Sequence, residues 1–180
     1  VQLHSEKDGP ASGEFMLILK VVFLQFFWLA IVLYGASINE ILLISWSIFI
    51  VGVNFLIYKP VISIGRFFFV ALLFTTFGYI HDSSLIWLKI ILIETYSYGF
   101  LSLWIVFISY YGDVFNKLKE LPLLFLAILG GIGGSLAYWS AYKLGAISIA
   151  LDSEAFYLIF VFVLWGIFFP LSMLVFYEDK

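Results

Sequence analysis

The chain has 180 residues, of which 64% are hydrophobic and only 12% are charged, with a net charge of −3. A soluble domain is about 45–50% apolar and about 25% charged, so a soluble protein of this size could not hide so much apolar surface in its core. Cysteine is absent, which excludes disulfides, thiolate metal sites and cysteine nucleophiles. We therefore predict an integral membrane protein, whose main solvent is lipid.

The first fifteen residues, VQLHSEKDGPASGEF, are polar and rich in turn-forming residues. They lack the apolar stretch after a basic start that defines a signal peptide. Met16 then opens the apolar run MLILKVVFLQFFWLAIVL. We expect residues 1–15 to be an added or disordered leader, and residues 16–180 to form a single transmembrane helical domain.

Six segments are long and apolar enough to cross a membrane, which takes about 20 mostly apolar residues per helix. Polar breaks such as GASINE, YKP and LDSE separate them. Pro122 stands where the fifth helix should start, a position that tolerates a missing N–H. The sequence thus predicts an all-α integral membrane protein, a bundle of about six transmembrane helices. Their expected ranges are 16–34, 41–58, 62–80, 95–112, 121–143 and 155–177.

The segment LIWLKIILI, residues 85–93, fits this scheme least well. It is apolar, but Glu94 interrupts it after nine residues. Short apolar runs do not reveal their structure by periodicity alone. Two interpretations stay open: an interfacial or re-entrant segment, or an outward extension of the fourth helix.

The basic residues indicate an orientation. If the N-terminus is cytoplasmic, seven of the nine basic residues fall at cytoplasmic ends or loops, and two fall outside. The positive-inside rule then predicts a multi-pass protein of the bacterial inner membrane, with both termini in the cytoplasm. The seven are Lys7, Lys20, Lys59, Arg66, Lys117, Lys119 and Lys180, and the two are Lys89 and Lys143.

The stretch LGGIGGSLAYWSAYKLGA, residues 129–146, is rich in glycine. A dinucleotide fingerprint would need a third glycine where Leu136 stands, and no phosphate-loop lysine follows. As a helix, the stretch presents small residues four apart, and small residues let helices in lipid approach closely. We predict that the fifth helix is the most tightly packed. The alternative, compatible with close packing, is that its glycines leave space for a lipid or solute that Ser135 and Tyr138 contact through their hydroxyls. The predicted packing residues are Gly130, Gly131, Gly133, Gly134, Ala137, Ala141 and Gly145.

The block GGSLAYWSAYKLGA, with FFWLAIVLYGA at 26–36, GYIHDSSL at 78–85 and WIVF in the fourth span, resembles the bacterial membrane family catalogued as domain of unknown function 2878. The resemblance covers essentially residues 16–177. Ser135 stands where the family pattern has proline, Ala137 where it has serine, and Gly112 where an asparagine often sits. The resemblance implies a membrane protein without assigned chemistry, whose genes often lie near those of lipid-modifying enzymes.

With this orientation, the outer side holds six ionisable residues besides the lysines. One interpretation is that they are solvated loop charges. The other is that His81, Asp82 and Glu94 line the mouth of an outward-facing polar cavity, since ionisable groups inside a membrane are costly and often functional. Asp82 is the strongest candidate because it also belongs to GYIHDSSL. The six are Glu40, His81, Asp82, Glu94, Asp152 and Glu154.

No catalytic or metal-binding motif is recognisable. His81 and Asp82 are adjacent and point about 100° apart on a helix, so they do not easily share one ion. The serine-hydrolase pattern G-x-S-x-G is absent. We expect no cofactor, no metal and no nucleic-acid partner; membrane lipid is the expected partner, and other membrane proteins are further candidates.

Three functions remain open from the sequence. The most favoured is a lipid-handling or accessory membrane protein. The alternatives are a small-solute transporter and an intramembrane enzyme that acts on lipid through His81, Asp82 or Glu94.

Overall fold

The computed structural model describes residues 10–58, 63–92, 98–107, 114–150 and 154–176, and every structural statement below concerns these residues. Six α-helices dominate them, joined by two short 3-10 helices and two short strands. The α-helices are α1 (Pro10–Tyr34), α2 (Glu40–Tyr58), α3 (Ile64–Trp87), α4 (Tyr98–Phe107), α5 (Leu123–Lys143) and α6 (Glu154–Phe176). The other elements are η1 (Gly35–Ser37), β1 (Ile91–Leu92), η3 (Phe115–Leu118) and β2 (Ser148–Ile149).

The helices have the length and composition of membrane spans. Three of them are long and apolar enough to cross a bilayer, namely Ile64–Trp87, Leu123–Lys143 and Glu154–Val175. Three further described stretches are apolar but shorter: Ile18–Tyr34, Glu40–Val53 and Tyr98–Phe107. The prediction of a helical protein is confirmed, with three helices long and apolar enough to span a membrane.

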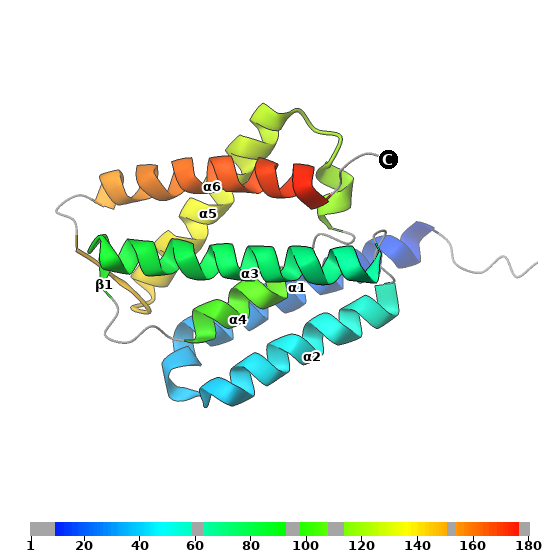
Figure 1. Ribbon diagram of the computed structural model, residues 1–180, viewed down its shortest axis with the longest axis horizontal. Coiled ribbons are helices and arrows are strands. Elements are labelled where there is room, and N and C mark those ends of the chain that lie inside the picture. Colours follow the sequence, from blue (N-terminus) through cyan, green and yellow to red (C-terminus); the bar gives the residue numbers. More distant parts are fainter. Residues whose placement is uncertain (1–9, 59–62, 93–97, 108–113, 151–153, 177–180) are drawn as a thin grey trace, which may run out of the picture.

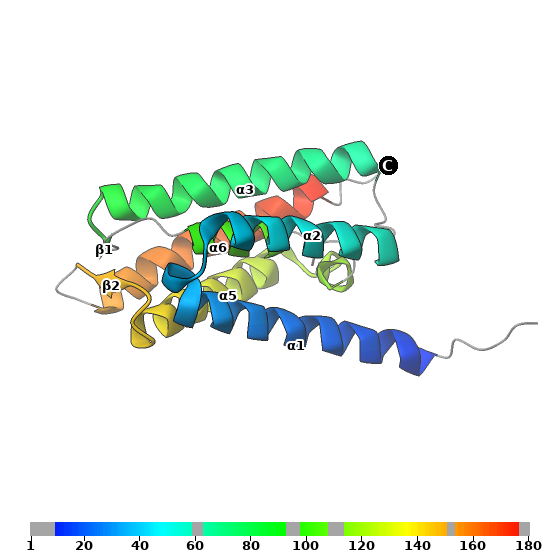
Figure 2. The ribbon, with the colours of Figure 1, turned by 90° about the horizontal axis from the view of Figure 1, so that it is seen from below.

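The helices form one bundle (Figure 1). α2, α3 and α6 run roughly along its long axis, and α5 crosses α6 obliquely. α1 and α3 lie on opposite sides, as Figure 2 shows. α5 and α6 make the most extensive helix pair, while the short α4 packs against α1, α2 and α3. The bundle thus has two parts, one built on α5 and one on α4.

The outer surface of the bundle is apolar. Large side chains such as Ile41, Leu56 and Leu72 are 77%, 75% and 69% exposed. A water-soluble monomer rarely leaves so much contiguous apolar surface uncovered. Lipid tails would cover this apolar surface and keep it from water, which agrees with the membrane-type composition of the helices.

A polar side chain caps α2, and a proline precedes α5. The side-chain oxygen of Asn39 accepts the backbone N–H groups of Ile41 and Leu42 at 3.0 and 3.2 Å. Pro122 directly precedes the first residue of α5, Leu123. Helix starts leave N–H groups unpaired, so caps and proline suit these positions. α2 and α5 therefore start within two residues of their predicted positions.

The predicted break at HDSS is wrong, because α3 continues through it to Trp87 instead of ending at residue 80. The chain stays helical because the polar groups of HDSS find partners: Ser84 donates to the carbonyl of Ile80 at 2.6 Å, and His81 contacts Asp82. Polar residues interrupt an apolar helix only when their groups remain unpaired. The outward extension of the fourth helix is wrong as well, since residues 85–87 finish α3 and residues 91–92 form β1. The interfacial interpretation of this segment stays a prediction.

α3 and α5 end in the same way. Lys89 and Gly145 follow them with positive φ angles of 55° and 79°. After each, an N–H closes back onto the helix: Ile90 onto the carbonyl of Leu85, and Ala146 onto that of Ala141, both at 2.9 Å. A left-handed residue followed by an N–H that bonds back to the last turn of the helix is the Schellman motif, which turns the chain sharply at a helix end.

The turns bring two strands together. β1 pairs with β2 in antiparallel fashion, with Ile91 opposite Ile149 and Leu92 opposite Ser148. The all-α prediction missed this ladder because two residues per strand leave no periodic pattern. The ladder ties the C-terminal ends of α3 and α5 to each other.

Substitutions at the two turns are expected to change the free energy of unfolding in opposite directions. A left-handed backbone costs an L-residue roughly 1–2 kcal/mol, and glycine avoids this cost. We expect Gly145→Ala to lower the free energy of unfolding by about 1 kcal/mol, and Lys89→Gly to raise it by up to about 1 kcal/mol. Unfolding in a denaturing detergent, followed by circular dichroism, measures both. Effects of the same sign would contradict the turn geometry.

Candidate functional site

A single buried carboxylate joins three helices. Asp82, on α3, is only 2% exposed. Its Oδ2 accepts the indole N–H of Trp104, on α4, at 2.9 Å, and its Oδ1 accepts the hydroxyl of Tyr138, on α5. His81 Nδ1 lies 2.9 Å from the same Oδ1. Three donors therefore balance this carboxylate, as a buried charge requires.

His81 is the neighbour that orients the network. It is 7% exposed, and its Nδ1 lies 3.2 Å from the Tyr138 hydroxyl as well as close to Asp82. A donor at Nδ1 fits a carboxylate, which only accepts hydrogen bonds. Its other ring nitrogen, Nε2, is buried and has no hydrogen-bond partner among the described residues.

The side chains of the adjacent His81 and Asp82 therefore contact each other, although neighbouring positions on a helix point in different directions. Within the described residues, no group of three or more histidine and acidic side chains is placed to hold a metal ion. The pair on its own gives two ligands, fewer than the usual protein metal sites use.

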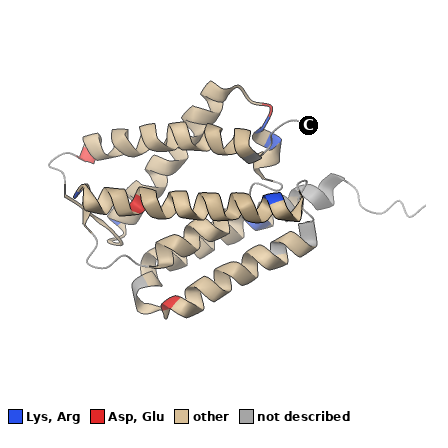
Figure 3. Cartoon of the chain, in the orientation of Figure 1, with Lys and Arg blue, Asp and Glu red and all other residues tan. Residues whose placement is uncertain are grey.

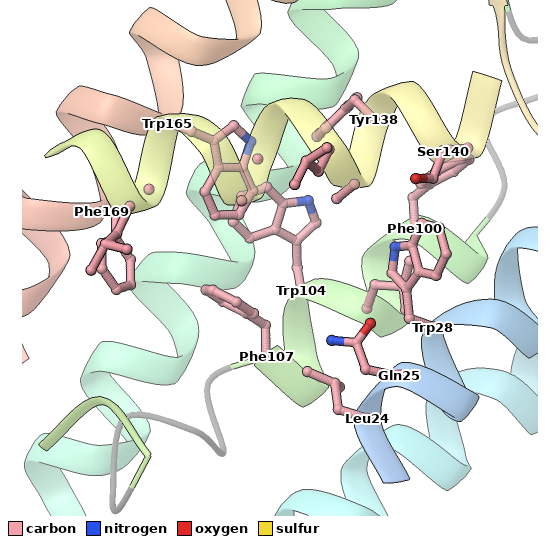
Figure 4. A pocket seen from close by; sticks show the side chains of 18 of the residues that line it. Leu24, Gln25, Trp28, Phe100, Trp104, Phe107, Tyr138, Ser140, Trp165 and Phe169 are labelled. Atoms are coloured by element: carbon pink, nitrogen blue, oxygen red, sulfur yellow. The ribbon is translucent and has the colours of Figure 1, made fainter. Parts of the chain in front are cut away.

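A pocket of about 560 Å³ opens beside the Asp82 network, between α1, α4, α5 and α6 (Figure 4). Its volume lies within the range of about 300–1,000 Å³ typical of small-molecule sites. Aromatic and aliphatic side chains form most of its wall, and the stacked rings of Trp104 and Trp165, 5.1 Å apart, form one side. Only four lining residues have polar side-chain groups other than an indole N–H: Gln25, Asp82, Tyr138 and Ser140.

The glycines of α5 divide between two faces. A Cβ atom on Gly130 would lie 2.7 Å from the backbone oxygen of Trp165, and one on Gly131 would lie 2.7 Å from the ring of Phe162. A Cβ on Gly134 would overlap the ring of Trp165. These three glycines therefore let α6 approach α5 closely.

Gly133 and Gly145 differ from these three, which corrects the prediction for them, whereas Ala141 is 3% exposed and lies in the hydrophobic core. A Cβ atom on Gly133 would meet nothing within 4 Å, and Gly133 and Ala137 line the pocket together with Gly130, Gly134 and Ala141. Gly145 lies beyond the helix end, where a Cβ would also meet nothing within 4 Å. The reason is rotation about the helix: at about 100° per residue, position 133 cannot share a face with both 130 and 131.

The remaining predicted site residues lie apart from the network. The Ser135 hydroxyl donates to the carbonyl of Leu158 at 3.2 Å and so links α5 to α6 instead of lining the pocket. Glu40 and Glu154 are exposed, and Glu154 binds Lys143 at 2.9 Å, as expected of solvated charges. His81 and Asp82 are buried, which contradicts that interpretation for them. Two predicted positions, Glu94 and Asp152, fall outside the described residues.

Three members of the site were not among the predicted site residues: Trp104, Gln25 and Ser140. Trp104 belongs to the WIVF segment, but nothing there marks it as the donor to Asp82, 22 residues away. Gln25 is the polar side chain that α1 contributes to the pocket. An amide within an apolar run was the one available signal, because such a group must find a partner in lipid.

A comparison with protein-family models gives a match that covers this site. A family model described as a protein of unknown function (DUF2878) matches residues 17–171. The chain belongs to this family. The resemblance predicted from GGSLAYWSAYKLGA is thereby confirmed, and the DUF2878 region contains the Asp82 network and every residue that lines the pocket. No match was found among curated proteins or among solved structures.

Proposed function

We propose that this DUF2878 protein is a multi-pass membrane protein that holds a lipid-like molecule in the pocket beside Asp82. The observation that carries the proposal is the pocket itself: about 560 Å³, mostly apolar and aromatic, inside a bundle whose outer surface is also apolar. Ligand pockets combine such walls with a few polar groups that orient the ligand. An acyl or similar chain fits the apolar part, and its polar end fits the four polar side chains.

The proposed placement is the bacterial inner membrane, with six crossings and both termini cytoplasmic. Most of the described basic residues lie toward the end of the bundle where α3 begins, and most acidic ones toward the end where α2 and α6 begin, with a few exceptions at each end (Figure 3). Arg66 lies in the first turn of α3, and Lys117 lies shortly before α5. Glu40 and Glu154 open α2 and α6. The positive-inside rule supports a cytoplasmic location for the basic end.

A small-solute transporter is the second candidate, and one observation favours it. The helix–turn–strand unit recurs: Lys89 and Gly145 are both left-handed residues directly after a helix cap, and β1 and β2 both follow them. Transporters often contain repeated units, with a substrate site between the repeats. Asp82 and Tyr138, one from each unit, bind each other. An intramembrane enzyme is less favoured, because the Asp82 oxygens already accept from three donors, which suits positioning better than proton transfer.

Filling the pocket tests the proposal. Gly133→Leu places a side chain in the pocket without a clash at Cβ, since a Cβ there meets nothing within 4 Å. We expect native mass spectrometry of the detergent-purified wild type to show a lipid-sized adduct, and Gly133→Leu to lose most of it.

Gly65→Leu is the matched control. Gly65 lies in the first turn of α3, its Cβ would also meet nothing within 4 Å, and it does not line the pocket. The control should keep the adduct. Adduct retained on Gly133→Leu, or lost equally from both variants, would exclude the pocket as the binding site.

A further inference from the structure

We propose that the polar end of the pocket's occupant is an uncharged hydroxyl group, and not a phosphate or an ammonium group. This inference rests on the proposed function and specifies the class of its ligand: an apolar chain that ends in an alcohol.

The charges around the pocket argue against an anionic head group. Asp82 is the one carboxylate among the described lining residues, and none of those residues is lysine or arginine. Lys143, on the same helix as Tyr138, is exposed and binds both carboxylate oxygens of Glu154, at 2.9 and 3.0 Å. A phosphate in the pocket would meet a carboxylate without a balancing cation, and charges repel strongly where water is scarce.

The hydrogen bonds of Asp82 argue against a cationic head group. Its oxygens already accept from Trp104 and Tyr138 and contact His81 Nδ1. An ammonium group would have to leave water for a carboxylate whose charge three donors already stabilise. Desolvation of a second charge costs several kcal/mol, which only excellent new geometry offsets.

Two polar side chains remain for a neutral head group. Gln25 and Ser140 line the pocket from α1 and α5, near Trp28 and Phe100 in Figure 4. The amide of Gln25 and the hydroxyl of Ser140 both donate and accept hydrogen bonds, and an alcohol also does both. Gln25 is exposed on the apolar surface of the bundle and Ser140 is half-buried. Polar groups that lipid keeps from water require partners, so an alcohol offers these side chains hydrogen bonds that a hydrocarbon end does not.

The experiment compares three probes that share a sixteen-carbon chain: hexadecanol, hexadecyl phosphate and hexadecylamine. Each is titrated against the full-length protein in detergent, and its occupancy is read by native mass spectrometry. We expect hexadecanol to bind most tightly. Equal or tighter binding of the phosphate or of the amine overturns the inference, and a preference for the amine would identify Asp82 as a counter-ion for a cationic ligand.

Variants locate the contact. Replacing Gln25 by leucine and Ser140 by alanine together should weaken hexadecanol binding about 3- to 10-fold, the effect of one or two neutral hydrogen bonds. Ser84→Ala is the matched control, because the Ser84 hydroxyl bonds within α3 to Ile80 and does not line the pocket. Unchanged hexadecanol binding in the double variant overturns the inference.

The outcomes separate the inference from the function on which it rests. If all three probes bind equally and Gly133→Leu removes them, the pocket binds chains and the hydroxyl preference is wrong. If no probe binds the wild type, the proposed function itself fails.

Discussion

Asp82→Ala is expected to lower the free energy of unfolding by about 2–4 kcal/mol, because three donors on three helices lose their acceptor at once. The donors are the side chains of His81, Trp104 and Tyr138. Unfolding by a denaturing detergent, followed by circular dichroism in the same micelles, measures the loss. The effect should exceed that of Tyr138→Phe, which removes one donor and leaves the other two in place.

Glu40→Ala is the control for Asp82→Ala. Glu40 is also acidic and lies on a helix, but it is exposed. A surface substitution of this kind changes stability by about 0.5 kcal/mol or less. If Asp82→Ala were no more destabilising than Glu40→Ala, the network would not hold α3, α4 and α5 together.

Gly130→Leu is expected to separate α5 from α6 and to lower the free energy of unfolding by about 3 kcal/mol, the upper end of typical overpacking costs. A Cβ atom at this position would lie 2.7 Å from the backbone oxygen of Trp165. A backbone atom cannot rotate away as a side-chain tip can, so the helices must move apart. The same unfolding assay measures the effect.

Gly133→Leu, three residues along the same helix, is the matched comparison. Its Cβ would meet nothing within 4 Å, and leucine favours helix over glycine by up to about 1 kcal/mol. We therefore expect unchanged or slightly raised stability together with loss of the pocket's ligand. Equal destabilisation by the two substitutions would show that the glycines of α5 do not divide between two faces.

The sequence was most informative where composition or a cap decides the structure. The apolar runs predicted six helices near their observed positions, and Pro122 marked the start of α5. These features are local, since they depend on a residue and its close neighbours in the chain. The family resemblance also rested on local blocks, and the family model confirms it.

The prediction failed for residues whose structural role depends on a partner far away in the sequence. HDSS resembled a loop because its charges had no visible partner, yet Trp104 and Tyr138 supply one from 22 and 56 residues away. The glycine pattern showed that α5 carries small residues, but only the position of α6 shows which of these glycines pack closely against a neighbouring helix. A single sequence does not show which residues distant in the chain contact each other.

The order of synthesis gives the Asp82 network a further consequence. The ribosome completes Asp82 22 residues before Trp104 and 56 residues before Tyr138. At about 5–20 residues per second, the Tyr138 hydroxyl arrives roughly three to eleven seconds later. Until Trp104 is made, roughly one to four seconds after Asp82, His81 is the one member of the network already present. His81 is thus the side chain available to shield the carboxylate while α3 enters the bilayer, so its substitution should reduce the yield of inserted protein more than the stability of the finished bundle.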